Sequence, residues 1–340
     1  MSEKEAPLNA NRCTVMLLRT FFAAVWLVGG WSVACAQEKV TLRLDFIPNG
    51  YHGPFYMAID KGYYREDGLD VQIGRGFGSV DTIKRVDAGS DTFGFADLYS
   101  AIKGVAEGAK VRAVGAGLAD AVGCIVALRK SGIRTIKDLE GRSLASSAGA
   151  STLLQLPSVL KAAGVDMGKV NVVLMDIVVK SSALVAGKVD SIQCVTVSEV
   201  PALLSQGQDL VVFEYRDHIS IMGTGLIASE ATTRTRPEEI RKFLKATYRG
   251  ARDFARDPAA ATAILVRSHP EGNAASYTGQ AKASAGLWAT SIAKQRGFGW
   301  MDDARMRNTM EQATRDFKLE RKIASGDFYT NEFVPVPPIR

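Results

Sequence analysis

Three side chains suited to binding a flat ligand lie at and just beyond the end of a short apolar stretch, residues 40–46. Phe46 offers a π face for stacking a heteroaromatic ring, while the amide of Asn49 and the imidazole of His52 can hydrogen-bond to the edge of such a ring. From the residues alone, the plainer alternative is favoured: Phe46 is a core residue at the strand end and Asn49 forms a turn.

A second candidate group is the small-residue loop at 146–152 (SSAGAST), which contains Ser147, Gly149 and Ser151. This loop opens a predicted helix, and the free N–H groups and dipole at a helix N-terminus favour an anion or a polar ring substituent. An ordinary helix cap at Ser151, with a glycine for the turn, explains the pattern equally well.

Two carboxylates follow predicted strands. Glu199 could accept charge-assisted hydrogen bonds from an exocyclic amino group such as a pyrimidine carries, or be a solvated surface residue. Asp97 begins a predicted helix, so capping of the helix N–H groups is its expected main role and a ligand contact a secondary one.

The elements that must position these side chains alternate along the chain. Apolar periodicity predicts strands at 40–46, 69–73, 92–96, 110–117, 124–128, 143–145, 170–174 and 191–195, and helices at 53–61, 80–88, 98–107 and 152–163. Such alternation predicts largely parallel α/β sheets, in which ligands bind beyond the carboxyl ends of strands.

Beyond Gly223 the pattern becomes mostly helical. Thr235 to Glu238 has the spacing of a capping box with a proline at the first helical position, and further helices are expected from Pro258, over 277–294 and over 302–317. One face of the helix that begins near Pro237 is apolar and is expected to be buried: Ile240, Phe243, Leu244, Thr247, Ala251 and Phe254.

Residues 1–36 have the pattern of a secretory signal peptide. Arg12 and Arg19 precede an apolar run that ends in small residues, with cleavage expected after Ala36. A membrane anchor and a lipidated Cys35 are the alternatives. We therefore expect a periplasmic or otherwise extracytoplasmic protein.

Composition limits the remaining classes. The 340 residues include 42 basic and 36 acidic side chains, a mild net charge of +6 without basic blocks, which argues against nucleic-acid binding. Cys124 and Cys194 would remain after cleavage; buried thiols are the default, and one disulfide is possible. The three histidines lie far apart and no catalytic or metal-binding motif occurs, so we expect no metal, no cofactor and no enzymatic activity.

Residues 45–71 (DFIPNGYHGPFYMAIDKGYYREDGLDV) resemble the solute-binding family that contains pyrimidine-precursor, riboflavin and sulfonate binders and the fungal thiamine-pyrimidine synthase. The resemblance is nearest to the formylaminopyrimidine-binding type. It extends over nearly the whole mature chain through GSDTFGFAD at 89–97, IKDLEGRSL at 136–144, AGKVDSIQCVTVSEVPAL at 186–203, RPEEIRKFLKAT at 236–247 and YTNEF at 329–333.

The resemblance implies an α/β, type II periplasmic binding protein fold, in which a two-crossover hinge joins two lobes. Lobe 1 would comprise residues 37–120 plus 225–340, and lobe 2 residues 121–224. It also implies a monomer that gives a small ligand to an ABC permease and its ATPase, and it favours Phe46, His52 and the 146–152 loop as ligand contacts.

The chain departs from the synthase members of this family. Those enzymes have a cofactor-binding lysine and a histidine where this sequence has Ala96 and Ser100, and a cysteine-rich motif where it has HISIMG at 218–223. We therefore predict a binding protein for a thiamine-pyrimidine precursor. A synthase-like enzyme, a riboflavin or sulfonate binder, and a sensory module remain alternatives.

Overall fold

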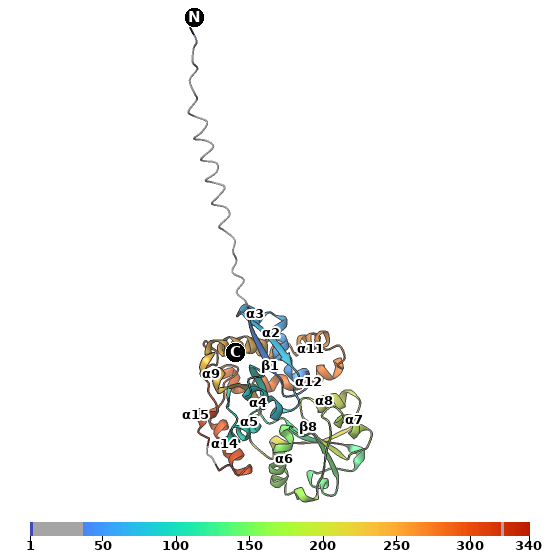
Figure 1. The fold of residues 1–340 in the computed structure, drawn as a ribbon. Helices are drawn as coiled ribbons and strands as arrows, with labels where there is room; N and C mark the ends of the chain where they lie inside the picture. The colour runs from blue at the N-terminus through green and yellow to red at the C-terminus, as the bar shows by residue number, and fades with distance from the viewer. Residues whose placement is uncertain (3–36, 321–322) are drawn as a thin grey trace. The chain divides into compact units, whose positions relative to one another are not determined.

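The structure is a computed structural model that describes residues 1–2, 37–320 and 323–340. The predicted signal peptide thus lies almost wholly outside the described residues. Residues 37–340 form a single unit built on two five-stranded sheets (Figure 1). In the described part of the chain, no helix combines the length and the apolar character needed to cross a membrane.

The first sheet has the strand order β2-β1-β3-β10-β4. In that order its strands are Leu69–Gly74, Glu38–Arg43, Phe93–Asp97, Thr224–Ser229 and Val111–Ala116. β1 runs parallel to β2 and β3, whereas β10 runs antiparallel to both of its neighbours. The pattern beyond Gly223 predicted mostly helix, and the strand β10 at the start of this region corrects that prediction.

The second sheet has the strand order β7-β6-β8-β5-β9. In that order its strands are Asn171–Leu174, Ser143–Ser146, Ser191–Val195, Gly123–Leu128 and Leu210–Glu214. β6 is parallel to β7 and β8, and β5 is antiparallel to β8 and β9. Each sheet therefore contains a parallel part, as predicted, and one antiparallel strand that the alternation of elements did not indicate.

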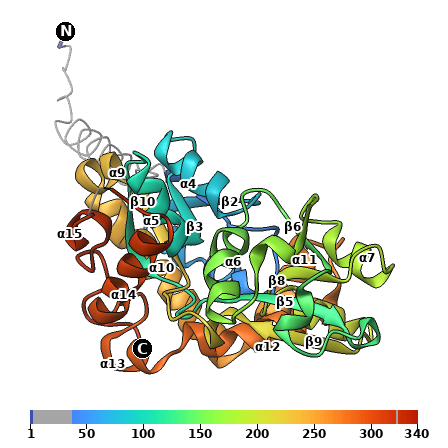
Figure 2. The same ribbon diagram turned by 90° about the horizontal axis from the view of Figure 1, so that it is seen from below.

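The chain crosses between the sheets twice, after β4 and after β9 (Figure 2). The first sheet takes its strands from residues 38–116 and 224–229, and the second from residues 123–214. The lobe boundaries at residues 120 and 224 stay a prediction.

Helices surround both sheets. Those of the first two thirds are α2 (Gly53–Asp60), α3 (Tyr63–Glu66), α4 (Ser79–Asp87), α5 (Leu98–Ala106), α6 (Ser151–Ala162), α7 (Lys180–Val185) and α8 (Glu199–Ser205). The remainder are α9 (Glu230–Thr235), α10 (Pro237–Arg256), α11 (Pro258–Ser268), α12 (Ala274–Trp288), α13 (Ser291–Arg296), α14 (Asp303–Asp316) and α15 (Ser325–Phe328).

Helix α10 packs its apolar face into the core of the first sheet. All six residues predicted for that face are buried, and the ring of Phe243 stacks on Phe93 with centroids 4.1 Å apart. Pro237 begins the helix as expected, but the capping box is wrong, because Thr235 ends the preceding helix and its hydroxyl donates to the carbonyl of Ala231.

The helix predicted over residues 277–294 is two helices. α12 ends at Trp288, and Thr290 accepts a hydrogen bond from the N–H of Ala293 and so caps α13. A threonine side chain competes well for N-cap positions, which explains the break. Residues of α12 pack against α8, so this helix joins the C-terminal third to the second sheet.

Candidate ligand-binding cleft

A small cavity of about 30 Å³ lies between residues that follow the strands of both sheets. Asp45, Phe46, Tyr51, Gly78 and Ser79 line it from the side of the first sheet; Ala150, Ser151, Thr152, Ile177, Lys180, Cys194, Val195 and Glu199 line it from the side of the second. This volume accommodates on the order of two water molecules. A heteroaromatic ring can therefore enter only when the two sides move apart.

The first wall depends on an early end to β1. The strand was predicted to continue to Phe46 but ends at Arg43, because the next residues bond to the loop after β2 instead. The carbonyls of Asp45 and Phe46 accept hydrogen bonds from the N–H groups of Gly78 and Gly76, at 3.0 and 2.8 Å. The backbone therefore turns and presents Asp45 and Phe46 to the cavity.

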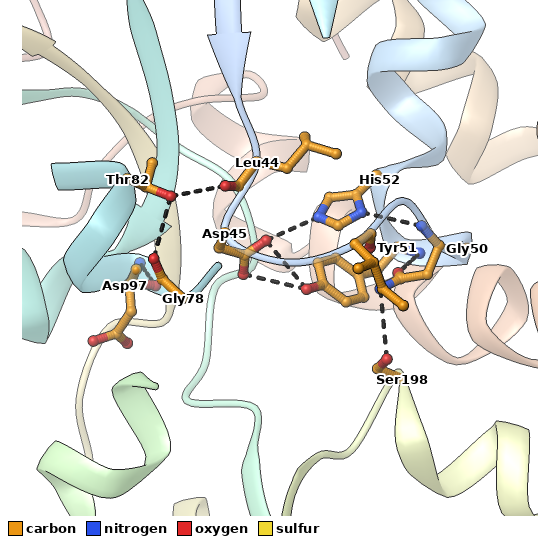
Figure 3. A network of polar contacts seen from close by, with 12 residues as sticks. Leu44, Asp45, Gly50, Tyr51, His52, Gly78, Thr82, Asp97 and Ser198 are labelled. Atoms are coloured by element: carbon orange, nitrogen blue, oxygen red, sulfur yellow. Dashed lines mark hydrogen bonds and ion pairs between the residues drawn. The ribbon is translucent and has the colours of Figure 1, made fainter. Parts of the chain in front are cut away.

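Asp45 is the centre of a polar network in this wall (Figure 3). Its carboxylate accepts hydrogen bonds from the Tyr51 hydroxyl at 3.1 and 3.2 Å and contacts Nε2 of His52 at 2.9 Å. Burial, followed by the charge of Asp45, raises the pKa of Tyr51 well above its usual value, so the phenol keeps its proton. Tyr51 therefore acts as a donor in this network.

His52 and Asn49 stabilise the turn from behind the wall. The backbone N–H of Asn49 donates to Nδ1 of His52 at 3.3 Å, which leaves Nε2 as the nitrogen that donates to Asp45. His52 is fully buried and its ring packs edge-on against Phe95. The Asn49 side chain accepts from the N–H of Tyr51, the turn-forming role considered for it.

The structure therefore brings some of the predicted contact residues to the cavity and not others. Phe46, Ser151 and Glu199 line it. His52 and Asn49 support the wall without lining the cavity. Their predicted ligand contacts stay a prediction.

Asp97 caps helix α5, which confirms its expected main role. One carboxylate oxygen accepts from the N–H and the hydroxyl of Ser100 at 2.7 and 2.6 Å. The other accepts from Nε2 of Gln155 on α6 at 3.0 Å, a contact from the first sheet's side to the second's. Burial raises the pKa of Asp97 to about 6, and Asp97 does not line the cavity.

The 146–152 loop closes against the loop before α4. The carbonyl of Gly149 accepts from the N–H of Val80 at 3.3 Å, and Gly149 itself has a positive φ of 78°. The alternative of an N-cap at Ser151 is wrong, because Ala150 occupies that position. The hydroxyl of Ser147 is buried and has no hydrogen-bond partner among the described residues.

Sequence reasoning missed Lys180, which lines the cavity beside Glu199. Lys180 is 3% exposed, and its Nζ donates to the carbonyl of Gln193 at 2.8 Å and lies 3.4 Å from Oε1 of Glu199. The other oxygen of Glu199 accepts from the N–H of Val195 at 2.9 Å. Lys180 follows the apolar residues Ile177 to Val179, but a lysine beside two serines gave no local signal that its charged side chain would be buried.

Cys124 and Cys194 form a disulfide. Of the two alternatives that the sequence allowed, buried free thiols and one disulfide, the structure has the second. The two residues are direct partners on the antiparallel strands β5 and β8, with Cα atoms 4.9 Å apart. Cys194 also lines the cavity, so the disulfide lies directly under the second wall.

Together these residues give the cavity a mixed aromatic and charged lining. The cavity offers an aromatic face, two carboxylates, one ammonium and the N-terminus of α6. Within residues 37–320 and 323–340, no group of three or more His, Cys, Asp or Glu side chains is placed to hold a metal ion. A larger open groove of about 510 Å³ between α4, α5 and α6 contains none of the predicted aromatic or carboxylate contacts.

Two mixed α/β sheets, two crossovers and a cavity between them define the type II periplasmic binding protein fold. The structure matches the periplasmic aliphatic sulphonate binding protein SsuA of Escherichia coli with a TM-score of 0.64 over 85% of this chain and 91% of that chain, at 16% identity. The predicted fold class is confirmed.

Residues 49–261 match the family model described as NMT1/THI5 like, and the chain belongs to that family. It is 25% identical to the riboflavin-binding protein RibY of Chloroflexus aurantiacus over 88% of this chain and 86% of that protein. It is also 25% identical to the formylaminopyrimidine-binding protein of Halalkalibacterium halodurans, over 76% and 79% of the two chains. A 4-amino-5-hydroxymethyl-2-methylpyrimidine phosphate synthase of Aspergillus parasiticus is similar as well, at 25% identity over 69% of this chain and 72% of the enzyme.

Proposed function

We propose that the protein is the extracytoplasmic solute-binding subunit of an ABC importer. It captures a small flat nutrient, a precursor of the thiamine pyrimidine, between its two lobes. The observation that carries this proposal is the cavity itself, in which an aromatic ring from one side faces ion-pairing and hydrogen-bonding groups from the other. The names of the binding proteins among its relatives support the same function.

Phe46 supplies the stacking surface. Its side chain is partly buried against the core of the first sheet and lines the cavity. A ring held against it would present its edge to Glu199 and to the N-terminus of α6 at Ser151. Stacking and edge hydrogen bonds together favour a flat heteroaromatic molecule over an aliphatic one.

Release and capture require the lobes to separate and close. The cavity is too small for a ring, and the two sides meet through Asp97 and Gln155 and through Val80 and Gly149. A ligand that fills the open cleft and bonds to both sides stabilises the closed form, because it binds that form more tightly. The closed form would present a different surface to a membrane permease and its ATPase.

The synthase among the relatives defines the enzymatic alternative. At the positions where family resemblance expects the lysine and histidine of the synthase, this chain has a fully buried Ala96 and Ser100, whose hydroxyl donates to Asp97. These side chains favour binding over synthase chemistry. Conversion of a bound pyrimidine by the purified protein, followed by mass spectrometry, would establish the enzymatic reading instead.

Calorimetric titration tests the proposed function. The mature chain, beginning at Gln37, is titrated with formylaminopyrimidine, hydroxymethylpyrimidine, riboflavin and an alkanesulfonate. We expect a pyrimidine to bind most tightly and Phe46→Ala to weaken that binding at least tenfold. Leu204→Ala, which removes an exposed side chain outside the cavity, is the control and should leave the affinity unchanged. Failure of every flat compound to bind would refute the ligand class.

A further inference from the structure

Lys180 and Glu199 form a buried ion pair at one corner of the cavity. Their side chains are 4% and 8% exposed, and both line the cavity. Burial of two charges costs free energy that their mutual attraction recovers only with good geometry and further hydrogen bonds. The distance of 3.4 Å between Nζ and Oε1 is long for a charge-assisted hydrogen bond.

Each partner is held by the backbone and retains unused hydrogen-bonding capacity. Lys180 donates to the carbonyl of Gln193, and Glu199 accepts from the N–H of Val195. An ammonium has three N–H donors and a carboxylate has about four acceptor positions, so these contacts do not saturate either group. A donor and an acceptor thus lie side by side in fixed positions at the cavity wall.

We propose that this pair reads two adjacent positions on the edge of a heteroaromatic ring. Lys180 donates to a ring acceptor, and Glu199 accepts from the donor next to it. The ligand class is therefore a ring with neighbouring donor and acceptor groups, as in a 4-aminopyrimidine or a lactam. This inference rests on the proposed function of the cleft and adds a specificity-determining residue, Lys180, to it.

The charges around the cavity argue against an anionic ligand. Asp45 and Glu199 line it together with a single ammonium, that of Lys180, so carboxylates outnumber ammonium groups two to one. A sulfonate presents acceptors only. It would have no group to donate to Glu199 and would leave that carboxylate buried beside a second negative charge.

A purely structural pair is the competing explanation. Lys180 begins α7 and its bond to Gln193 links this helix to β8, so replacing it could weaken binding without any contact to the ligand. A structural role would change the affinities of all ligands by the same factor. If Lys180 contacts the ligand, replacing it changes the ratio of the affinities for two ligands that differ in one atom at the ring edge. This ratio of affinities is the quantity to measure.

The experiment titrates three probes into the mature chain by calorimetry. They are 4-amino-5-hydroxymethyl-2-methylpyrimidine, the same ring without the amino group, and a pyridine analogue that lacks the ring nitrogen next to the amino-bearing carbon. We expect the wild-type protein to prefer the first probe to each of the others at least tenfold. Lys180→Met should abolish the preference over the pyridine analogue. Glu199→Gln, whose amide oxygen still accepts a hydrogen bond but carries no charge, should weaken the preference over the probe without the amino group. Lys180→Arg, which keeps a hydrogen-bond donor, should retain part of the preference over the pyridine analogue.

Each outcome supports or overturns one of the two proposals. If the wild type binds the first probe and the ratios are unchanged in Lys180→Met, the pair does not read the edge, although the cleft still binds pyrimidines. If the wild type binds none of the probes, the ligand class of the proposed function fails as well. An alkanesulfonate should not bind the wild type, and removal of the carboxylate charge in Glu199→Gln should improve its binding at least tenfold. Tight binding of the alkanesulfonate by the wild type would overturn the inference.

Discussion

Replacement of Asp97 by asparagine should make the protein less sensitive to pH between 4 and 7.5. Asp97 is 5% exposed, and burial raises its pKa from 3.8 to about 6. The folded protein therefore binds this proton more tightly than the unfolded chain does. The stability that the carboxyl contributes is fully present below pH 3.8 and is lost as the pH rises through 6.

The size of the effect follows from the pKa shift. The difference between a pKa of 3.8 and one of about 6 corresponds to about 3 kcal/mol between the protonated and ionised forms. The amide in Asp97→Asn stays neutral over the whole range. It can also keep the contact to α6, because the Oε1 atom of Gln155 is buried without a partner and the side chain can turn to accept a hydrogen bond.

The assay is urea unfolding of the wild type and Asp97→Asn at pH 4, 5, 6 and 7.5. The free energy of unfolding of the variant, relative to wild type, should rise by about 2.5 kcal/mol from the lowest to the highest pH, because the unfolded carboxyl already begins to ionise below pH 4. Glu239, whose pKa burial raises to about 7, shifts both curves equally and so cancels in the difference. A difference that stays constant within about 0.5 kcal/mol would refute the account of Asp97, since the ionised form would then carry no penalty.

Two further predictions concern closure and the disulfide. In Gly78→Ala the new Cβ would lie 2.6 Å from the carbonyl oxygen of Gly149, so ligand affinity measured by calorimetry should fall at least tenfold; Gly89→Ala, which also has a positive φ but no atom within 4 Å, should lose about 1 kcal/mol of stability and keep its affinity. Equal affinity losses in both variants would contradict this steric argument. The double substitution of Cys124 and Cys194 by serine should lower the free energy of unfolding by up to about 4 kcal/mol, because the bond closes a loop with a sequence separation of 70. Urea unfolding checks this. The prediction would be contradicted if the wild type had the same free energy of unfolding with and without reductant.

The sequence predicted those helices and strands whose pattern of apolar and polar residues lies within the element itself. The strand predicted over residues 191–195 matches β8, and the apolar stripe of α10 predicted its buried face, whereas alternation placed β1 two to three residues too late. The strand β10 was missed because its short apolar run follows Gly223 and precedes a long helical region, and only pairing with β3 and β4 makes it a strand. Its antiparallel direction depends on the path of the chain between the lobes, for which no local signal exists.

The residues of the candidate site also fall into those that the sequence reveals and those that depend on contacts with distant parts of the chain. Phe46 and Glu199 could be predicted, because an aromatic or acidic residue after a strand is visible in the sequence. The inward burial of His52 could not, since it depends on Asp45 turning away from the end of β1 to meet the imidazole. Lys180 was invisible for a similar reason: its partners Gln193 and Glu199 come from later elements that fold against it.

The position of β10 also has a consequence for the order in which the protein folds. Residues 123–214 supply all five strands of the second sheet, so that sheet can assemble as soon as this stretch is available. The first sheet must wait, because β4 joins β3 only through β10, which begins at Thr224, whereas β3 ends at Asp97. Until then the β1-β2-β3 half has an unpaired edge. Contacts between strands this distant in sequence form slowly, so the nascent first lobe is the part of the chain that most needs protection from aggregation.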